Sequence, residues 1–97
     1  MITVIAKFHI KPEHLDDLYH EFVELTRYSR SVAGCHRYDF YQEANAPETF
    51  VLIEEWESEQ IVYQHVESDV VQKVREKITL ASAAEPEVTI LNPVVIA

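Results

Sequence analysis

The chain has 97 residues, 47% of them hydrophobic and 26% charged, which predicts one globular domain over residues 1–97. Lysine and arginine number 8 against 17 aspartates and glutamates, and this net charge of −9 argues against a nucleic-acid partner. No apolar run is long enough to cross a bilayer, and the first residues do not have the build of a signal peptide. With a single cysteine, Cys35, the chain is expected in the cytoplasm, without a membrane partner.

The single glycine, Gly34, excludes the glycine-rich loops that hold phosphate groups. Nucleotides, NAD and flavins are therefore not expected as ligands. The 5 histidines have no H-x-x-x-H or H-E-x-x-H spacing, so we expect no metal site. With the glycine-rich loops also excluded, no cofactor is expected.

The first predicted elements are a strand over residues 2–10 and a helix from Glu13 to about Val32. Alternate residues of the strand form an apolar face that includes Phe8. Pro12 suits the first turn of a helix, and apolar residues then recur with helical spacing. The predicted buried stripe of this helix consists of Leu15, Leu18, Tyr19, Phe22 and Leu25.

A hairpin is predicted next, with strands over residues 35–42 and 49–56 and a turn at 43–48. Ser58 and Ser68 are suitable N-caps for two further helical segments. The second segment has a predicted buried stripe of Val70, Val71, Val74, Ile78 and Ala81. A last strand is predicted over residues 88–96.

The resulting order, β-α-β-β-α-β, is the ferredoxin-like arrangement, an α+β fold with helices on one face of a four-stranded antiparallel sheet. The other face would also be apolar, because it carries Ile5, Val51, Ile53 and Val95. A second copy of the chain is expected to cover this face and so form a homodimer with sheet against sheet. The alternative is a monomer with an apolar surface.

Polar residues interrupt the buried stripe of the first helix at Thr26 and Ser29. They either line a pocket between helix and sheet or bond back to carbonyl groups of their own helix. His65 also points inward by helical spacing, where burial would favour its neutral form and make it a candidate base. The alternative for His65 is a core histidine whose ring nitrogens are hydrogen-bonded.

Two acids lie at the end of the third strand, and one of them must face the helices. Glu54 shares a face with Trp56, and Glu55 takes the opposite face. Neither position suits a carboxylate without a partner. The alternative is a strand-end carboxylate that reaches solvent or pairs with Arg30 or Arg37.

These motifs, taken in order, resemble the antibiotic biosynthesis monooxygenase (ABM) domain family. The matching segments are ITVIAKFHIKPE, Ser29-Arg30 before Gly34-Cys35, the tetrapeptide HRYD and the block FVLIEEWESEQIVYQH. The resemblance implies a dimeric α+β barrel with a small pocket between sheet and helices. It also implies oxidation of phenols, quinols or polycyclic aromatics by O₂ without metal or flavin.

Under this hypothesis His65 is the general base that removes a proton from a small phenolic or quinol substrate. The proposed substrate-binding residues are Phe8, Tyr19, Phe22, Thr26, Ser29, Arg30, Glu54 and Trp56. Two alternatives remain open: an isomerase or tautomerase of a small polar signal metabolite, and a non-catalytic dimeric module that binds a ligand or serves in a stress response.

Overall fold

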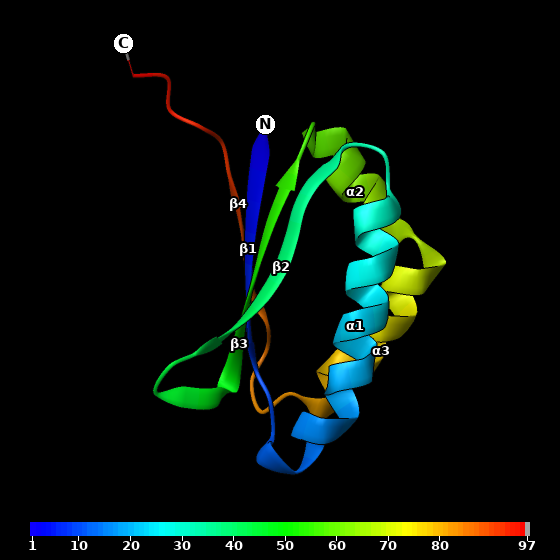
Figure 1. Ribbon diagram of the computed structural model, residues 1–97, viewed down its shortest axis with the longest axis vertical. Coiled ribbons are helices and arrows are strands. Elements are labelled where there is room, and N and C mark those ends of the chain that lie inside the picture. The colour runs from blue at the N-terminus through cyan, green and yellow to red at the C-terminus, as the bar shows by residue number, and fades with distance from the viewer. Residues whose placement is uncertain (97) are drawn as a thin grey trace.

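A computed structural model describes residues 1–96 (Figure 1). Its elements are β1 (Ile2–His9), a 3-10 turn (Pro12–His14), α1 (Leu15–Ser31), β2 (Cys35–Glu43), β3 (Ala46–Trp56), α2 (Glu59–Glu67), α3 (Asp69–Ala81) and β4 (Glu87–Leu91). The strands form one antiparallel sheet in the order β2-β3-β1-β4. The helices lie together on one side of this sheet (Figure 1). The predicted ferredoxin-like α+β fold is confirmed.

The core lies between the helices and one face of the sheet. In β1, burial alternates along the strand and selects Val4, Ala6 and Phe8. Leu18, Phe22 and Leu25 of α1 pack against this face, and Val71, Val74, Ile78 and Ala81 of α3 are buried as well. Among residues 1–96, none of the helices has both the length and the apolar character needed to span a membrane.

Both predicted helical stripes were too wide by one residue. Tyr19 is 66% exposed and Val70 is 39% exposed. Each stands one position from a buried residue, Leu18 and Val71 respectively, and one position turns a side chain by about 100° on a helix. The buried stripes therefore follow a spacing of three and four residues.

The last strand is shorter than predicted, because β4 ends at Leu91. Val94, Val95 and Ile96 lie outside the strand with 81%, 94% and 86% of their surface exposed. Pro93, which has no backbone N–H, cannot continue the hydrogen bonding to β1. β3 in turn begins earlier than predicted, at Ala46, which shortens the connection from β2.

Gly34 joins α1 to β2 with φ +93°, in the left-handed region that other residues seldom occupy. Its carbonyl accepts a hydrogen bond from the Glu57 amide at 2.8 Å. A Cβ at this position would lie 2.6 Å from Cδ1 of Ile61. The backbone angle therefore favours glycine here, and the tip of the Ile61 side chain would have to move to admit a Cβ.

We expect Gly34→Ala to lower the free energy of unfolding by about 1–3 kcal/mol, because alanine is strained at this φ. Urea denaturation measures the loss. Ala33→Gly is the matched control, since no residue other than glycine has a positive φ among those described, and it should cost about 1 kcal/mol at most. Equal unfolding midpoints for Gly34→Ala and the wild type would contradict this account.

Candidate active site

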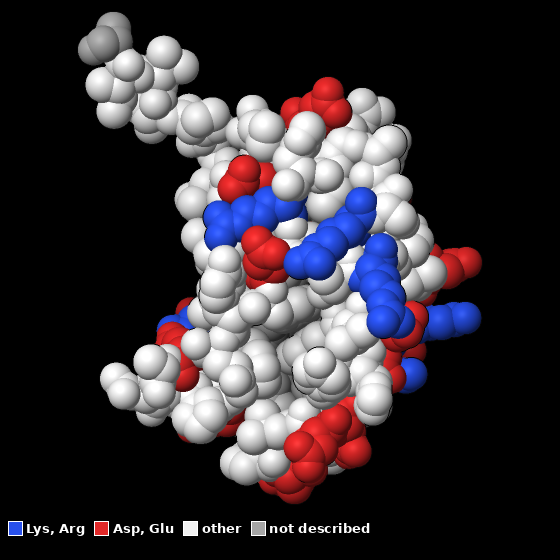
Figure 2. All heavy atoms as spheres, viewed as in Figure 1, with Lys and Arg blue, Asp and Glu red and all other residues white. Residues whose placement is uncertain are grey.

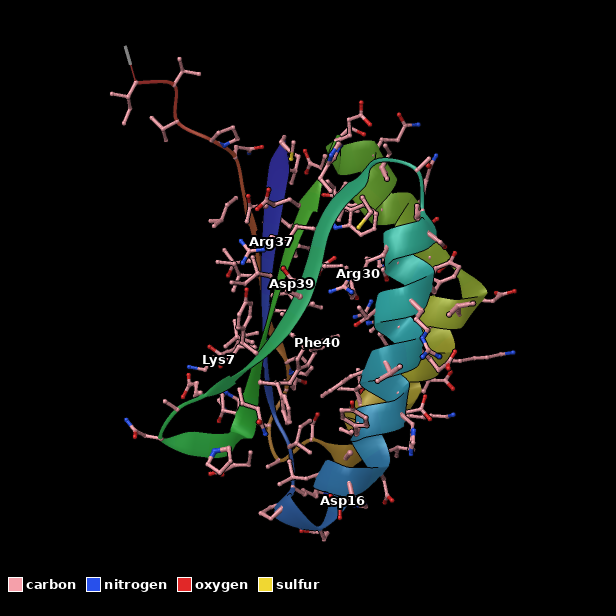
Figure 3. The ribbon with its side chains drawn as sticks, viewed as in Figure 1. Lys7, Asp16, Arg30, Arg37, Asp39 and Phe40 are labelled. Atoms are coloured by element: carbon pink, nitrogen blue, oxygen red, sulfur yellow. The ribbon has the colours of Figure 1, made fainter. Side chains whose placement is uncertain are left out.

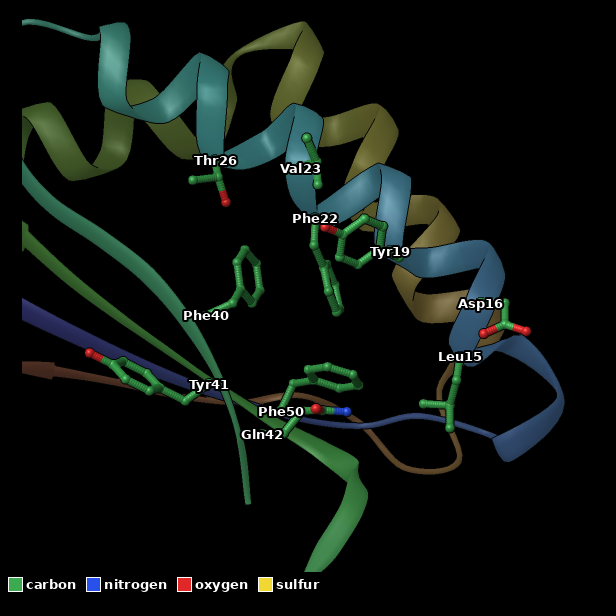
Figure 4. Close-up of a pocket in the computed structure, with 10 residues that line it drawn as sticks. All are labelled: Leu15, Asp16, Tyr19, Phe22, Val23, Thr26, Phe40, Tyr41, Gln42 and Phe50. Atoms are coloured by element: carbon green, nitrogen blue, oxygen red, sulfur yellow. The ribbon is translucent and has the colours of Figure 1, made fainter. Parts of the chain in front are cut away.

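A groove of about 640 Å³ opens between α1 and the strands β2 and β3 (Figure 4). We call it the aromatic groove. Its lining residues are Leu15, Asp16, Tyr19, Phe22, Val23, Thr26, Phe40, Tyr41, Gln42 and Phe50. In the space-filling view the surface is hollowed between α1 and the strands, and the hollow itself is largely uncharged (Figure 2).

Three phenylalanine rings form the walls of the aromatic groove. Phe22 stacks on Phe40 with centroids 4.3 Å apart and meets Phe50 edge-on at 5.0 Å. Phe8 lies buried behind them, with its centroid 6.3 Å from those of Phe22 and Phe40. A planar ring can pack against such faces and edges. The groove therefore suits an aromatic ligand.

The pairing of β3 with β2 shows what lies beyond the groove. Along the helix-facing side of the sheet, Phe50 pairs with Gln42, then Leu52 with Phe40, then Glu54 with Tyr38. Successive pairs on one face are about 7 Å apart. The surface of the sheet thus changes from aromatic to polar within one step.

Five side chains gather at this inner end, and we call them the polar cluster: Ser29, Tyr38, Glu54, Trp56 and His65. All five are buried, with exposed fractions of 0%, 2%, 7%, 0% and 5% in that order. They come from α1, β2, β3 and α2.

Glu54, rather than Glu55, faces the helices. Trp56 Nε1 donates a hydrogen bond to Glu54 Oε1 at 2.9 Å. Burial raises the pKa of the Glu54 carboxyl to about 7, although the bond from Trp56 acts in the opposite direction. Glu55, on the other face, accepts from Arg37 Nη1 at 3.4 Å. Glu54 can therefore exchange a proton near neutral pH.

The imidazole of His65 is enclosed by aromatic rings, with centroids 4.5 Å from Trp56 and 5.7 Å from Tyr38. Its Nε2 lies 2.7 Å from Ser29 Oγ. Its Nδ1 is buried and has no hydrogen-bond partner among the described residues. Burial lowers the pKa of His65 to about 4, so the ring is neutral at pH 7.

Tyr38 lies beside both Glu54, with which it pairs across the strands, and the imidazole of His65. Burial and the charge of Glu54 raise the pKa of its phenol, and a hydrogen bond from Ser29 offsets part of that rise. The Ser29 hydroxyl therefore lies against Tyr38 and His65 and is hydrogen-bonded to a side chain of another helix.

A family model described as antibiotic biosynthesis monooxygenase (ABM) matches residues 1–77. The chain belongs to this family. Its relatives include a Bacillus subtilis (strain 168) protein named "Putative monooxygenase YcnE", 31% identical over 68 residues, which are 70% of this chain and 72% of that protein.

Solved structures of ABM proteins and their relatives share the whole fold. A crystal structure of an antibiotic biosynthesis monooxygenase is 27% identical, with a TM-score of 0.94, 98% of this chain and 100% of that chain being covered. A conserved protein from Methanosarcina mazei Go1 is 30% identical, with a TM-score of 0.90 and coverage of 93% and 89%.

The residues that the ABM resemblance proposed for the site fall into separate groups. Tyr19, Phe22 and Thr26 line the aromatic groove. Ser29, Glu54, Trp56 and His65 belong to the polar cluster, and Phe8 packs behind the groove. None of these polar-cluster residues is among the described residues that line the groove. His65 lies in the interior and contacts Ser29, which is one helical turn beyond Thr26 on α1.

Arg30 lies at the surface, away from the polar cluster. Its Nη2 donates to Asp39 Oδ1 at 2.9 Å and its Nε donates to the Tyr38 carbonyl at 3.2 Å. Asp39 also accepts from Arg37 Nε at 2.9 Å, so the three side chains form a charged group on β2 and α1 (Figure 3). The hydrogen bonds of the exposed Arg30 guanidinium therefore connect α1 to β2.

Sequence reasoning missed the strand side of the groove, namely Phe40, Tyr41, Gln42 and Phe50. A signal was present, because Tyr38, Phe40 and Gln42 alternate along β2 and share a face. The pairing register that sets Phe40 beside Leu52 could not be read from that alternation alone.

The raised pKa of Glu54 has a consequence for stability. The folded carboxyl keeps its proton up to about pH 7, whereas the unfolded one loses it near the ordinary value of 4.5. Rising pH through this window therefore favours unfolding. We expect Glu54→Gln to gain about 2–3 kcal/mol of stability relative to the wild type between pH 4.5 and 8, measured by urea denaturation.

His65→Gln provides a comparison of opposite sign. The unfolded imidazole takes up a proton below its ordinary pKa of 6.5, but the folded one does so only near 4. The wild type thus loses stability as pH falls through this window, and His65→Gln should lack that loss.

A stability difference between Glu54→Gln and wild type that is independent of pH would show that the carboxyl is not buried as described.

Proposed function

We propose that this ABM protein uses O₂ to oxidise a small, uncharged phenol or quinol bound in the aromatic groove. The observation that carries the proposal is the position of the groove. Its aromatic walls end one step from a buried cluster that holds two proton-accepting groups. The monooxygenase names of the family and of its relatives support the same class of reaction.

The chemistry requires a base more than any other protein group. Triplet oxygen accepts electrons one at a time, and a neutral phenol donates them slowly. Loss of the phenolic proton gives an electron-rich phenolate that can donate an electron to O₂. The protein then has to bind the ring, exclude water and accept the proton. His65 is the acceptor that the sequence suggested, and its neutral form suits that role.

The charge of the protein favours an uncharged substrate. The net charge is −9, and Asp16 lies at one end of the groove with Leu15 (Figure 4). An anionic ligand would be repelled by this field, and a neutral ring would not. Thr26 and Gln42 are the groove residues that can hydrogen-bond a substrate hydroxyl without carrying charge.

An isomerase or tautomerase of a small polar metabolite is the second candidate, because the polar cluster can move a proton without oxygen. O₂ consumption with an oxygen electrode separates the two functions. Consumption that tracks the loss of a quinol supports the oxygenase. Product without oxygen uptake supports the isomerase, and saturable binding without product supports a ligand-binding module.

A substitution that fills the groove tests where the substrate binds. We expect Thr26→Phe to raise KM for a small quinol at least about tenfold, equivalent to about 1.4 kcal/mol of lost binding. The measurement is oxygen uptake against quinol concentration. His20→Phe, an exposed position of the same helix, is the matched control. Unchanged KM in Thr26→Phe would place the substrate elsewhere.

We also propose that two copies associate through the face of the sheet that the helices do not cover. Ile5 pairs with Ile53 there, and both are only half-buried in the single chain. Val51 lies on the same face. Burial of this apolar surface by a second copy would stabilise the sheet on both sides.

We expect sedimentation to find a dimer for the wild type and a monomer for Ile53→Glu, because a charge at this position would be buried without a partner. Gln60→Glu adds the same charge at an exposed position of α2 and should remain dimeric. Dimers of equal stability in both variants would rule out this face as the interface.

A further inference from the structure

We infer that Glu54 accepts the substrate proton. His65, which lies further from the groove, has a structural role in the polar cluster. This inference rests on the proposed function, because it assigns a role within that reaction. It follows from the order of groups along the inner face of the sheet and from the hydrogen bonds that each group already makes.

Of the two buried proton acceptors, Glu54 lies nearer the groove along the sheet, and neither is among the described residues that line it. Phe40, which lines the groove, pairs with Leu52, and the next pair on the same face is Glu54 with Tyr38. A ring packed against Phe40 would therefore direct a hydroxyl group toward the Glu54 carboxyl. His65 lies further along, over Trp56, on α2.

The hydrogen bonds distinguish the two candidates as well. Trp56 holds Oε1 of Glu54 at 2.9 Å, and among residues 1–96 this is the one side-chain hydrogen bond found for that carboxyl. Oε2 is thus left to accept a proton. The Nε2 of His65 lies 2.7 Å from Ser29 Oγ, and its Nδ1 is buried with no hydrogen-bond partner among the described residues. His65 also packs against Trp56, one step further from the groove than Glu54, so Glu54 is the nearer acceptor for a substrate in the groove.

The proton transfer is balanced within the site. The O–H bond of the phenol breaks, its proton forms a new O–H bond at Glu54 Oε2, and the electron pair stays on the phenolate oxygen. One negative charge moves from the carboxylate to the substrate, so the total charge of the buried site does not change. This matters in an apolar interior, where creating a new charge is costly.

The groups that face Glu54 leave its carboxyl without a cationic partner. Tyr38 and Cys35 of β2 lie close enough for the charge of Glu54 to raise their pKa values, and Trp56 is its hydrogen-bond donor. From α2, His65 is neutral near pH 7. Burial raises the pKa of Glu54 to about 7, near the value that serves a base best at neutral pH.

A nitrophenol tests the proton transfer directly, because its phenolate absorbs visible light and its neutral form does not. On binding to the wild type, at a pH where the free phenol is mostly neutral and Glu54 partly ionised, phenolate absorbance should appear. Glu54→Gln should bind the nitrophenol, as shown by quenching of the sole tryptophan, Trp56, without that absorbance. Glu55→Gln, on the opposite face, should behave as the wild type does.

His65→Gln decides between the two candidate bases. We expect it to bind nitrophenol and still produce phenolate, because the acceptor is retained. Loss of phenolate in His65→Gln together with its retention in Glu54→Gln would overturn the assignment. Absence of phenolate in the wild type, with binding intact, would overturn it as well.

Turnover gives the second measurement. For any quinol that the wild type oxidises, Glu54→Gln should lower kcat by about 10²–10⁴-fold, the range expected for removal of a general base, with KM changed little. Unchanged kcat would overturn the assignment. Phenolate formation by a wild type that consumes no O₂ would contradict the oxygenase and uphold Glu54 as the acceptor, so the two proposals can fail separately.

Discussion

A hydrogen bond from the Trp56 indole to the Glu54 carboxyl, 2.9 Å long, lies in the interior of this small domain. Both side chains are nearly inaccessible to solvent. The ionised form of a carboxyl group with one neutral donor and no nearby cation is unfavourable in such a buried position. The position is costly for folding at neutral pH, and burial brings the pKa of this carboxyl to about 7, a value that suits the proposed role of proton acceptor.

The arrangement of the sheet explains how such a group can lie beside a binding site. Alternation along β3 places Phe50, Leu52, Glu54 and Trp56 on one face, so a single strand carries both the aromatic wall and the acid. α1 also runs from the groove toward the polar cluster. Its Phe22 lines the groove, and its Ser29, further along the helix, is hydrogen-bonded to His65. Under the proposed function, a ligand that entered between α1 and β3 would meet apolar surface first and the polar cluster last.

Strand alternation was sufficient to predict that Glu54 and Trp56 share a face, and helical spacing was sufficient to place His65 inside. Neither could decide which acid faces the helices, because both faces of β3 carry apolar residues. Tyr19 was misplaced because it lies one position from Leu18, outside the narrow buried stripe of α1. Phe40 was missed because its role depends on strand register, which is set by pairing and not by local sequence.

A crystal structure with a slowly oxidised phenol, grown without oxygen, tests the central claim most directly. The account predicts the ring in the aromatic groove against Phe40 and Phe50, with its hydroxyl oxygen within hydrogen-bond distance of Glu54 Oε2. A ring bound elsewhere, or one in the groove whose hydroxyl points away from Glu54 toward solvent, would contradict it.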